Sequence, residues 1–290
     1  MPTLTRLLLL FACLLLGPLV VIADELPKDT NTIESLTPEQ ARKLAAEFKG
    51  DYHLSLNGLT TLDAATAKAL VEFKCIQLYL NGLTTLDTAT AKALAEFKGG
   101  RLDLFGLTTL DAVTAKALTE FKGVYLLVHG LTTLDADTAK VLAEFKAWDG
   151  QLPKLTIVDA ATAKALAEFK GQTLHLNGLT TLDAAAAKAL AASDTWNGFL
   201  PSLTGFESPD SVAVAKALAA RKGPLSLPNL KTISPKTLSA LIEKEDVEIP
   251  LIKTLELIPE PDGSVTEDFV IPKGFETRQK RQQYRKIAPG

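Results

Sequence analysis

Leucine and small polar residues alternate in a pattern that returns every 24 residues along most of the chain. In residues 54–75, which read LSLNGLTTLDAATAKALVEFKC, Leu54 and Leu56 alternate with polar residues. This is the period-two pattern of a short strand with one buried side. Ala67 and Leu70 then recur at the spacing of a buried helical stripe. Each unit is therefore predicted to contain a short strand, a turn and a helix.

Two polar features connect the strand of each unit with its helix. Asn57-Gly58 is predicted to turn the chain, because both residues tolerate positive φ. Asp63 stands directly before the Ala-rich run, where its carboxylate can accept from the free N–H groups of the first helical turn. The aspartate recurs as Asp63, Asp87, Asp111, Asp135, Asp159 and Asp183. Helix capping explains this column without calcium, since each aspartate is followed directly by Ala or Thr rather than by a second carboxylate.

A repeat of fixed length predicts a solenoid, in which units too small to bury their own apolar faces stack on one another. Strand followed by helix, with a short return, makes the strands parallel. Strands lie about 4.8 Å apart, whereas helix axes need about 8–10 Å, so the stack is expected to bend with its strands inside. The predicted fold is an α/β, right-handed solenoid with a parallel sheet on the concave face and short helices on the convex face.

Departures from the repeat divide the chain into segments. The predicted organisation is a signal peptide at 1–23, a solenoid at 24–258 with an N-terminal capping helix at 37–49 and a final strand at 247–255, and a flexible polar and basic tail at 259–290. Thr37 and Gln40 have the spacing of a capping box, with Pro38 at the first helical position. The tail is expected to hold at most a transient helix near 276–285.

Residues 1–23 have the features of a cleaved export signal. Arg6 is followed by an apolar stretch at 7–22, and small residues stand where a signal peptidase would cut. The mature chain is therefore expected to be exported to the periplasm, the cell surface or the medium, with no stable membrane span. A retained anchor is the alternative, against which Gly17-Pro18 counts. After cleavage Cys75 is the one cysteine left, interpreted as a passive substitution at a helix end.

Charge and histidine spacing exclude several kinds of chemistry. A net charge of −3 and a pI near 5.7 give no reason to expect nucleic acid as a partner. His53, His129 and His175 fall in different layers, the closest pair roughly 10 Å apart, too far to share one zinc ion. A triad of Ser55, His53 and Asp103 exists on paper, but no turn presents the hydroxyl as a nucleophile. We expect no catalytic residues, no metal and no cofactor.

The repeated unit Leu-x-Leu-x-Gly-Leu-x-x-Leu, followed by a helix, resembles the leucine-rich-repeat proteins, in particular exported bacterial arrays of LxLNGLTxL units. The resemblance covers roughly residues 33–258. It departs from the family pattern where that pattern has a buried Asn, since leucine occupies the position: Leu59, Leu83, Leu107, Leu131 and Leu179. No asparagine ladder is therefore expected. The resemblance implies a binding scaffold with a concave sheet, and the family has no catalytic motif to transfer.

Outward strand positions differ from unit to unit while the framework stays constant, as a recognition surface would. Tyr79, Phe105 and Tyr125 concentrate exposed apolar bulk there and are the expected interface anchors. Trp148 and Trp196 stand in matching motifs 48 residues apart, as a pair of indoles able to hold a sugar or peptide. The alternative is that each Trp covers the entrance to its strand. The candidate partner-binding residues are Tyr79, Arg101, Asp103, Phe105, Tyr125, His129, Trp148, His175 and Trp196.

The leading hypothesis from sequence is a non-enzymatic, exported repeat scaffold that binds a macromolecule through its concave sheet. The partner would be a protein or a cell-envelope polymer. The alternative is a structural spacer in the cell envelope, attached through its C-terminal tail.

Overall fold

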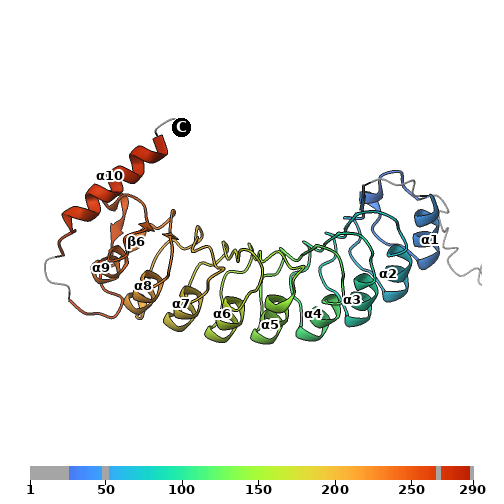
Figure 1. Ribbon diagram of the computed structural model, residues 1–290, viewed down its shortest axis with the longest axis horizontal. Coiled ribbons are helices and arrows are strands. Elements are labelled where there is room, and N and C mark those ends of the chain that lie inside the picture. Colours follow the sequence, from blue (N-terminus) through green and yellow to red (C-terminus); the bar gives the residue numbers. More distant parts are fainter. Residues whose placement is uncertain (1–25, 48–51, 266–268, 288–290) are drawn as a thin grey trace, which may run out of the picture.

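The computed structural model describes residues 26–47, 52–265 and 269–287. The predicted signal peptide, residues 1–23, lies outside this part of the chain, as do the last two residues of the predicted capping helix 37–49. Through the described part, helices alternate with short parallel strands or strand-like segments, and Figure 1 shows them as layers of one curved stack. The chain is therefore an α/β repeat solenoid, as its periodicity predicted.

Four short strands form the main sheet: β1 (His53–Ser55), β2 (Gln77–Tyr79), β3 (Arg101–Asp103) and β4 (Tyr125–Leu127). They pair in sequence order and in parallel, in a register that advances by one repeat, so that Leu54 pairs with Leu78 and Leu78 with Leu102. Beyond β4 the pairing continues as isolated bridges and two short pairs, β5 (Leu225–Ser226) with β7 (Val247–Glu248) and β6 (Thr232–Ile233) with β8 (Glu256–Leu257).

The repeat helices lie along the outer, convex edge of the arc, with the strands toward its inside (Figure 1). They are α2 (Ala64–Leu70), α3 (Thr88–Ala95), α4 (Ala112–Leu118), α5 (Ala136–Glu144), α6 (Ala160–Ala167), α7 (Ala184–Ala191), α8 (Ser211–Ala219) and α9 (Pro235–Ile242). Small residues face the neighbouring helices, and Ala67, Ala91 and Ala115 are fully buried. Alanine therefore lets each helix approach the next closely.

Each layer contributes the same apolar positions to one continuous core. Leu56, Leu59 and Leu70 are fully buried, and their equivalents in the next layers are buried as well. The rings of Phe97 and Phe121 stack with their centroids 6.4 Å apart, which continues the core along the stack. Leu54, Leu56 and Leu70, which the periodicity placed on the buried side, are therefore confirmed as framework residues.

The aspartate column caps the helices, as predicted. Each side chain accepts a hydrogen bond of 2.6–2.8 Å from the backbone N–H three residues on. In most repeats that third residue is a buried threonine whose hydroxyl donates to a carbonyl of the preceding layer at 3.2–3.4 Å: Thr66, Thr90, Thr138 and Thr162. One short motif thus begins the helix and also ties it to its neighbour.

These caps make stability dependent on pH. The pKa values of Asp63, Asp111 and Asp159 are lowered, chiefly by the backbone N–H three residues on. A carboxylate with a lowered pKa stabilises the fold fully above its unfolded pKa of about 3.9, and this contribution is lost as the pH falls through the folded value. We expect urea denaturation to show a lower free energy of unfolding at pH 3 than at pH 7.

The matched control is the triple variant D63N/D111N/D159N. Asparagine caps helices about as well as aspartate but does not titrate in this range. This variant is expected to lose less stability between pH 7 and pH 3 than the unaltered protein. An equal loss in the two proteins would contradict the role of the caps.

The Asn-Gly turns differ from the sequence-based expectation. Among the described residues, positive φ occurs at Gly150, Gly198, Gly223 and Gly263, not at the Asn-Gly turns. The turn glycines are needed for close approach instead. A Cβ added at any of them would lie 2.1–2.5 Å from a carbonyl oxygen of the preceding layer: Gly58, Gly82, Gly106, Gly130 and Gly178.

The N-terminal end is closed by α1 (Pro38–Glu47) and a short 3-10 turn, η1 (Thr30–Thr32). The predicted capping box is confirmed, because Thr37 N–H donates to Gln40 Oε1 at 2.9 Å and Gln40 N–H donates to Thr37 Oγ1 at 3.2 Å. The Thr30 hydroxyl donates to Ser55 O at 2.6 Å, and Ile33 is buried. The segment from η1 to α1, which has no strand of its own, therefore covers the first layer of the stack.

The C-terminal segment corrects two expectations. The predicted strand 247–255 is interrupted by a 3-10 turn, η2 (Ile252–Thr254), between β7 and β8. The segment expected to hold at most a transient helix contains α10 (Lys273–Ile287), which lies against the end of the stack (Figure 1). Phe275 of this helix is buried. The Gln279 side chain accepts from Ile252 N–H and donates to Pro250 O. The side-chain amide of Gln279 thus pairs with the backbone of residues 250–252 as a neighbouring strand would.

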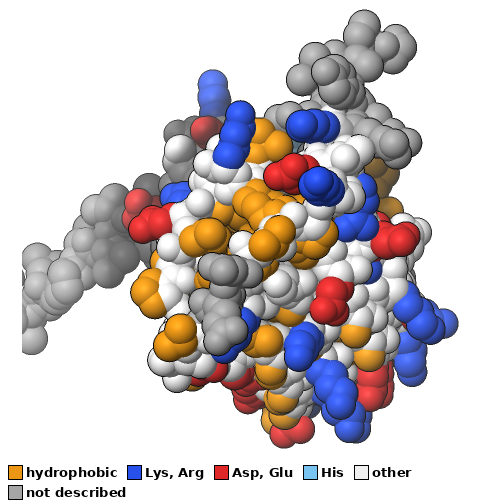
Figure 2. Space-filling view, turned by 90° about the vertical axis from the view of Figure 1, so that its left-hand side faces the viewer, with side chains coloured by type: hydrophobic (Ala, Val, Ile, Leu, Met, Phe, Trp, Pro, Cys, Tyr) orange, Lys and Arg blue, Asp and Glu red, His pale blue; other side chains and the backbone are white. Residues whose placement is uncertain are grey.

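Figure 2 views this C-terminal end and shows hydrophobic side chains gathered among charged ones. The large apolar residues exposed in this region are Leu257, Val265 and Val270. Glu260 lies deeper, where its Oε1 accepts from Lys236 N–H and so caps α9 from outside that helix. The end of the solenoid is closed by residues that lie outside the repeat pattern.

Two further sequence features fit the fold. Cys75 is a buried free thiol whose pKa is raised by burial, which keeps it protonated and agrees with a passive role. Within the described ranges, no helix combines the length and the apolar character needed to cross a bilayer.

Candidate functional site

The outward-facing positions of strands β1–β4 form two rows across the sheet. The strand register places His53, Gln77, Arg101 and Tyr125 in the first row and Ser55, Tyr79, Asp103 and Leu127 in the second. In later layers Gln151 pairs with His175, at the same step of 24 residues. The columns predicted from spacing are thus confirmed in these layers.

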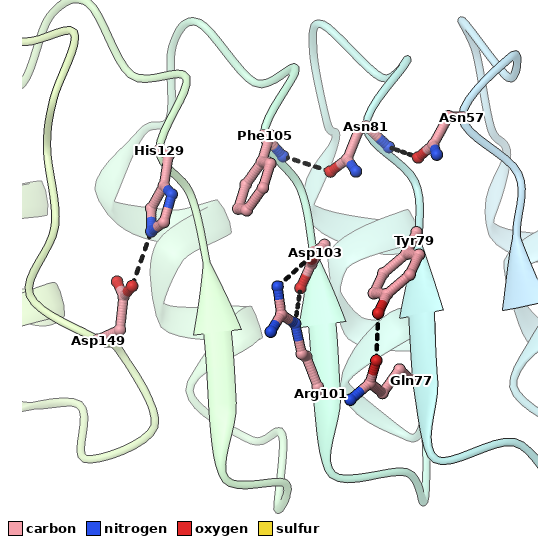
Figure 3. Close-up of polar contacts among 9 residues, drawn as sticks. All are labelled: Asn57, Gln77, Tyr79, Asn81, Arg101, Asp103, Phe105, His129 and Asp149. Carbon is pink, nitrogen blue, oxygen red and sulfur yellow. Dashed lines mark hydrogen bonds and ion pairs between the residues drawn. The ribbon is translucent and has the colours of Figure 1, made fainter. Parts of the chain in front are cut away.

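An asparagine ladder runs along one edge of these rows, contrary to expectation. Asn31 Oδ1 accepts from Asn57 Nδ2 at 3.0 Å, Asn57 Oδ1 accepts from Asn81 N–H at 3.1 Å, and Asn81 Oδ1 accepts from Phe105 N–H at 3.0 Å. Figure 3 shows the last two steps. The ladder lies two positions before the leucines that replace the family's buried asparagine. The sequence indicates the ladder only through the recurrence of Asn at positions 57 and 81, a recurrence that a repeated turn also explains.

Two pairs of stacked rings connect neighbouring layers of this face. Phe105 stacks on His129 with ring centroids 4.5 Å apart, and Tyr79 stacks on His53 at 5.5 Å. Tyr125 is 53% exposed, whereas Tyr79 and Phe105 are half-buried. The three predicted anchors therefore share one face, and two of them are held by ring contacts with histidines.

Arg101 and Asp103 form a bidentate ion pair in the site. Arg101 Nε and Nη2 donate to the two oxygens of Asp103 at 2.7 and 2.8 Å (Figure 3). These hydrogen bonds are the main cause of the raised pKa of Arg101, to which the charge of Asp149 also contributes. The guanidinium also lies 5.7 Å from the ring centroid of Tyr79. Asp103 is buried, so the guanidinium of Arg101 is the more accessible group of the pair.

The sequence-based site missed Asp149, which contacts a predicted site residue. Its Oδ2 lies 2.7 Å from His129 Nε2, and its Oδ1 accepts from Gln151 N–H at 3.2 Å (Figure 3 shows the first contact). The matching residue of the second Trp motif, Asn197, lies 2.9 Å from His175 Nδ1. In both motifs the residue after the tryptophan therefore contacts a histidine of the preceding layer. The repeated Trp-Asp/Asn-Gly motif was the available signal.

Both tryptophans are buried, which counts against a pair of indoles that holds a sugar or peptide and agrees with the alternative that each Trp covers its strand. Trp148 and Trp196 are 2% and 1% exposed. By the 24-residue step, Gly150 and Gly198, both with positive φ, fall at the position of the central strand leucine, but in the structure Trp148 pairs with Leu126 and Trp196 with Leu174. Trp148 bridges to Leu126 and packs edge-on against Phe169, with ring centroids 4.9 Å apart. Each indole fills core space that the missing leucine leaves.

The outward face does not assemble the triad or the metal site considered from sequence. Asp103 is held by Arg101, while His53 stacks on Tyr79, so the triad written from sequence is not assembled. Within the described residues, no group of three or more His, Cys, Asp or Glu could hold a metal ion. The face instead offers rings, a fixed guanidinium, a carboxylate and imidazoles.

No protein-family model matches the sequence, and no curated protein matches it. Among solved structures, the fold is similar to that of an internalin (inlF) from Listeria monocytogenes str. 4b F2365, with 17% sequence identity and a TM-score of 0.39. The match covers 68% of this chain and 55% of the internalin chain, so this protein spans about half the length of that structure. The TM-score is too low to support any transfer of function. The architecture therefore rests on the backbone pairing of this chain.

Proposed function

We propose that this protein is an exported, non-enzymatic repeat scaffold that binds a protein through the concave face of strands β1–β4 and the turns that follow them. The observation that supports it most directly is the contrast between the two sides of each strand. The buried leucines repeat without change, while the outward residues Tyr79, Arg101 and Tyr125 differ in size and charge from layer to layer. Export is proposed from residues 1–23, and a right-handed coil from the preference of parallel crossovers.

The order of the side chains adds to the support. Tyr79 and Phe105 are held against His53 and His129, so their rings are placed before a partner arrives. Binding then costs less side-chain entropy than it would for mobile chains. Buried aromatic anchors commonly carry most of the energy of a protein interface. Of the three proposed anchors, Tyr125 is the most exposed and so has the largest fraction of its surface still to bury.

The test compares capture of binding partners from native envelope extract by the unaltered chain and by the triple variant Y79A/F105A/Y125A. We expect at least a tenfold loss of capture, because truncating interface anchors costs about 2 kcal/mol or more. The control is K92A/K116A/K140A, which alters exposed lysines of α3, α4 and α5. Circular dichroism checks folding, since each lost ring contact is worth about 0.5–1.5 kcal/mol. Unchanged capture, or an equal loss in the control, would refute the proposal.

The alternative is a cell-envelope spacer attached through residues 259–290. Deleting this segment would also remove α10 from the end of the solenoid, so the deletion is not a clean test. Substituting alanine for Lys273 and Lys280, both exposed on α10, leaves Phe275 and Gln279 in place. Loss of envelope association in K273A/K280A, with capture by the concave face unchanged, would favour the spacer.

A further inference from the structure

A cavity of about 400 Å³ opens beside β4, at the layer where Gly150 interrupts the strand pattern. The regular unit would place a leucine there, and the chain instead turns with φ of +75°. Tyr125, Asp149 and Gln151 line this cavity, together with His175 of a later layer. The cavity is large enough for the end of one long side chain.

Asp149 supplies a negative charge that no described Lys or Arg contacts directly, although Arg101 interacts with it at longer range. Its side chain is 11% exposed, and none of the described Lys or Arg residues forms an ion pair with it. Its contact with His129 is an ion pair only when the imidazole is protonated. The nearby Arg101 donates both of its hydrogen bonds to Asp103. A carboxylate offers about four lone-pair sites, of which His129 and Gln151 N–H use two.

The ring of Tyr125 gives the cavity a second feature that suits a cation. It lines the same cavity and is 53% exposed, so a planar cation can lie over its face. Guanidinium fits better than ammonium, because it stacks on aromatic rings and forms directed hydrogen bonds to carboxylates. Lys146 also lines the cavity, but its side chain is exposed, so its ammonium can remain in water.

We propose that this cavity binds the guanidinium group of an arginine side chain presented by a protein partner. The inference rests on the proposed binding function of the concave face and names the chemistry of one contact in it. The guanidinium lies against Tyr125 and donates to the free lone pairs of Asp149. Lys146 opposes binding, because it places a second positive charge at the cavity.

The experiment titrates the full chain with L-argininamide and, separately, with L-citrullinamide, an isostere whose side-chain urea is uncharged. Binding is followed by isothermal titration calorimetry and by the imidazole NMR signals of His129 and His175. We expect citrullinamide to bind at least about tenfold more weakly, since a charge-assisted hydrogen bond is worth about 1.5–3 kcal/mol. Asp149→Asn should weaken argininamide binding by a similar factor, and Lys146→Ala should strengthen it about twofold to fivefold.

The matched control is Asp137→Asn, an exposed carboxylate on α5 away from the cavity, which should leave binding unchanged. Equal binding of the two amides, equal effects of Asp149→Asn and Asp137→Asn, or weaker binding in Lys146→Ala would each overturn the proposal. Binding of inorganic phosphate that is lost in Lys146→Ala would show an anion site instead. Should the cavity fail these tests while Y79A/F105A/Y125A still loses partner capture, the scaffold function stands without the arginine contact.

Discussion

Replacing Gly82 by alanine is expected to lower the free energy of unfolding by about 3 kcal/mol, at the upper end of the cost of overpacking a close contact. The new Cβ would lie 2.3 Å from Asn57 O and 2.5 Å from Leu59 O. Both atoms belong to the backbone of the preceding layer, so they cannot rotate away as a side chain would. The layers would have to separate, which also strains the hydrogen bond between Asn57 and Asn81. Urea denaturation at neutral pH measures the effect.

The matched control is Gly100→Ala in the next layer of the stack, directly before β3. Its added Cβ would meet atoms of Ile76 at 3.9 and 4.0 Å, which is ordinary van der Waals contact. This variant is expected to stay within about 0.5 kcal/mol of the unaltered protein. Equal losses in Gly82→Ala and Gly100→Ala would mean that the turn glycines do not set the approach of the layers.

The framework could be predicted from sequence because its causes are local and repeated. Asp63 precedes a helical run, and any carboxylate in that position meets free N–H groups, so the cap followed from neighbouring residues alone. Leu54, Leu56 and Leu70 alternate with the periods of a strand and a helix, and periodicity directly reports which side is buried. With every unit repeating these signals, the parallel register followed from the constant step.

Contacts between layers were harder to predict, because they depend on distances that a single unit does not contain. Asn57 has the residue type of a turn, and only the position of Asn81 one layer away makes it a rung of a ladder. Gly82 likewise suggests free φ, whereas its real constraint is the carbonyl oxygen of Asn57. The sequence left two roles open for Trp148, and only its pairing with Leu126 of the preceding layer places the indole in the core.

In the candidate site too, the positions within each unit could be predicted from sequence, whereas the contacts between layers could not. The rows containing Tyr79, Arg101 and Tyr125 followed from strand alternation, and the structure brings these residues onto one face. Their partners did not follow, since Asp149 stands where the strand pattern breaks and contacts His129 of the preceding layer. Partner binding by these residues remains a prediction for the variants above to test.

The second large effect is expected at the C-terminal end, where Phe275→Ala should release α10 from the solenoid. Phe275 is 3% exposed, and truncating a buried phenylalanine typically costs about 3–5 kcal/mol. In a solenoid each layer contacts only its neighbours, so the loss should stay local. Hydrogen exchange should therefore speed up at Ile252 N–H, which Gln279 protects, and along β7 and α9, while strands β1–β4 keep their protection.

Lys280→Ala provides the control, because this side chain lies on the exposed side of the same helix. Protection at Ile252 N–H should be unchanged in that variant. If Phe275→Ala altered exchange equally in β1–β4 and in β7, the ends of the stack would be coupled as one cooperative unit. If it altered exchange nowhere, α10 would not contribute to closing the solenoid. The buried Phe275 and Gln279 lie outside the 24-residue pattern. The contribution of α10 therefore depends on its tertiary packing and cannot be inferred from the repeat.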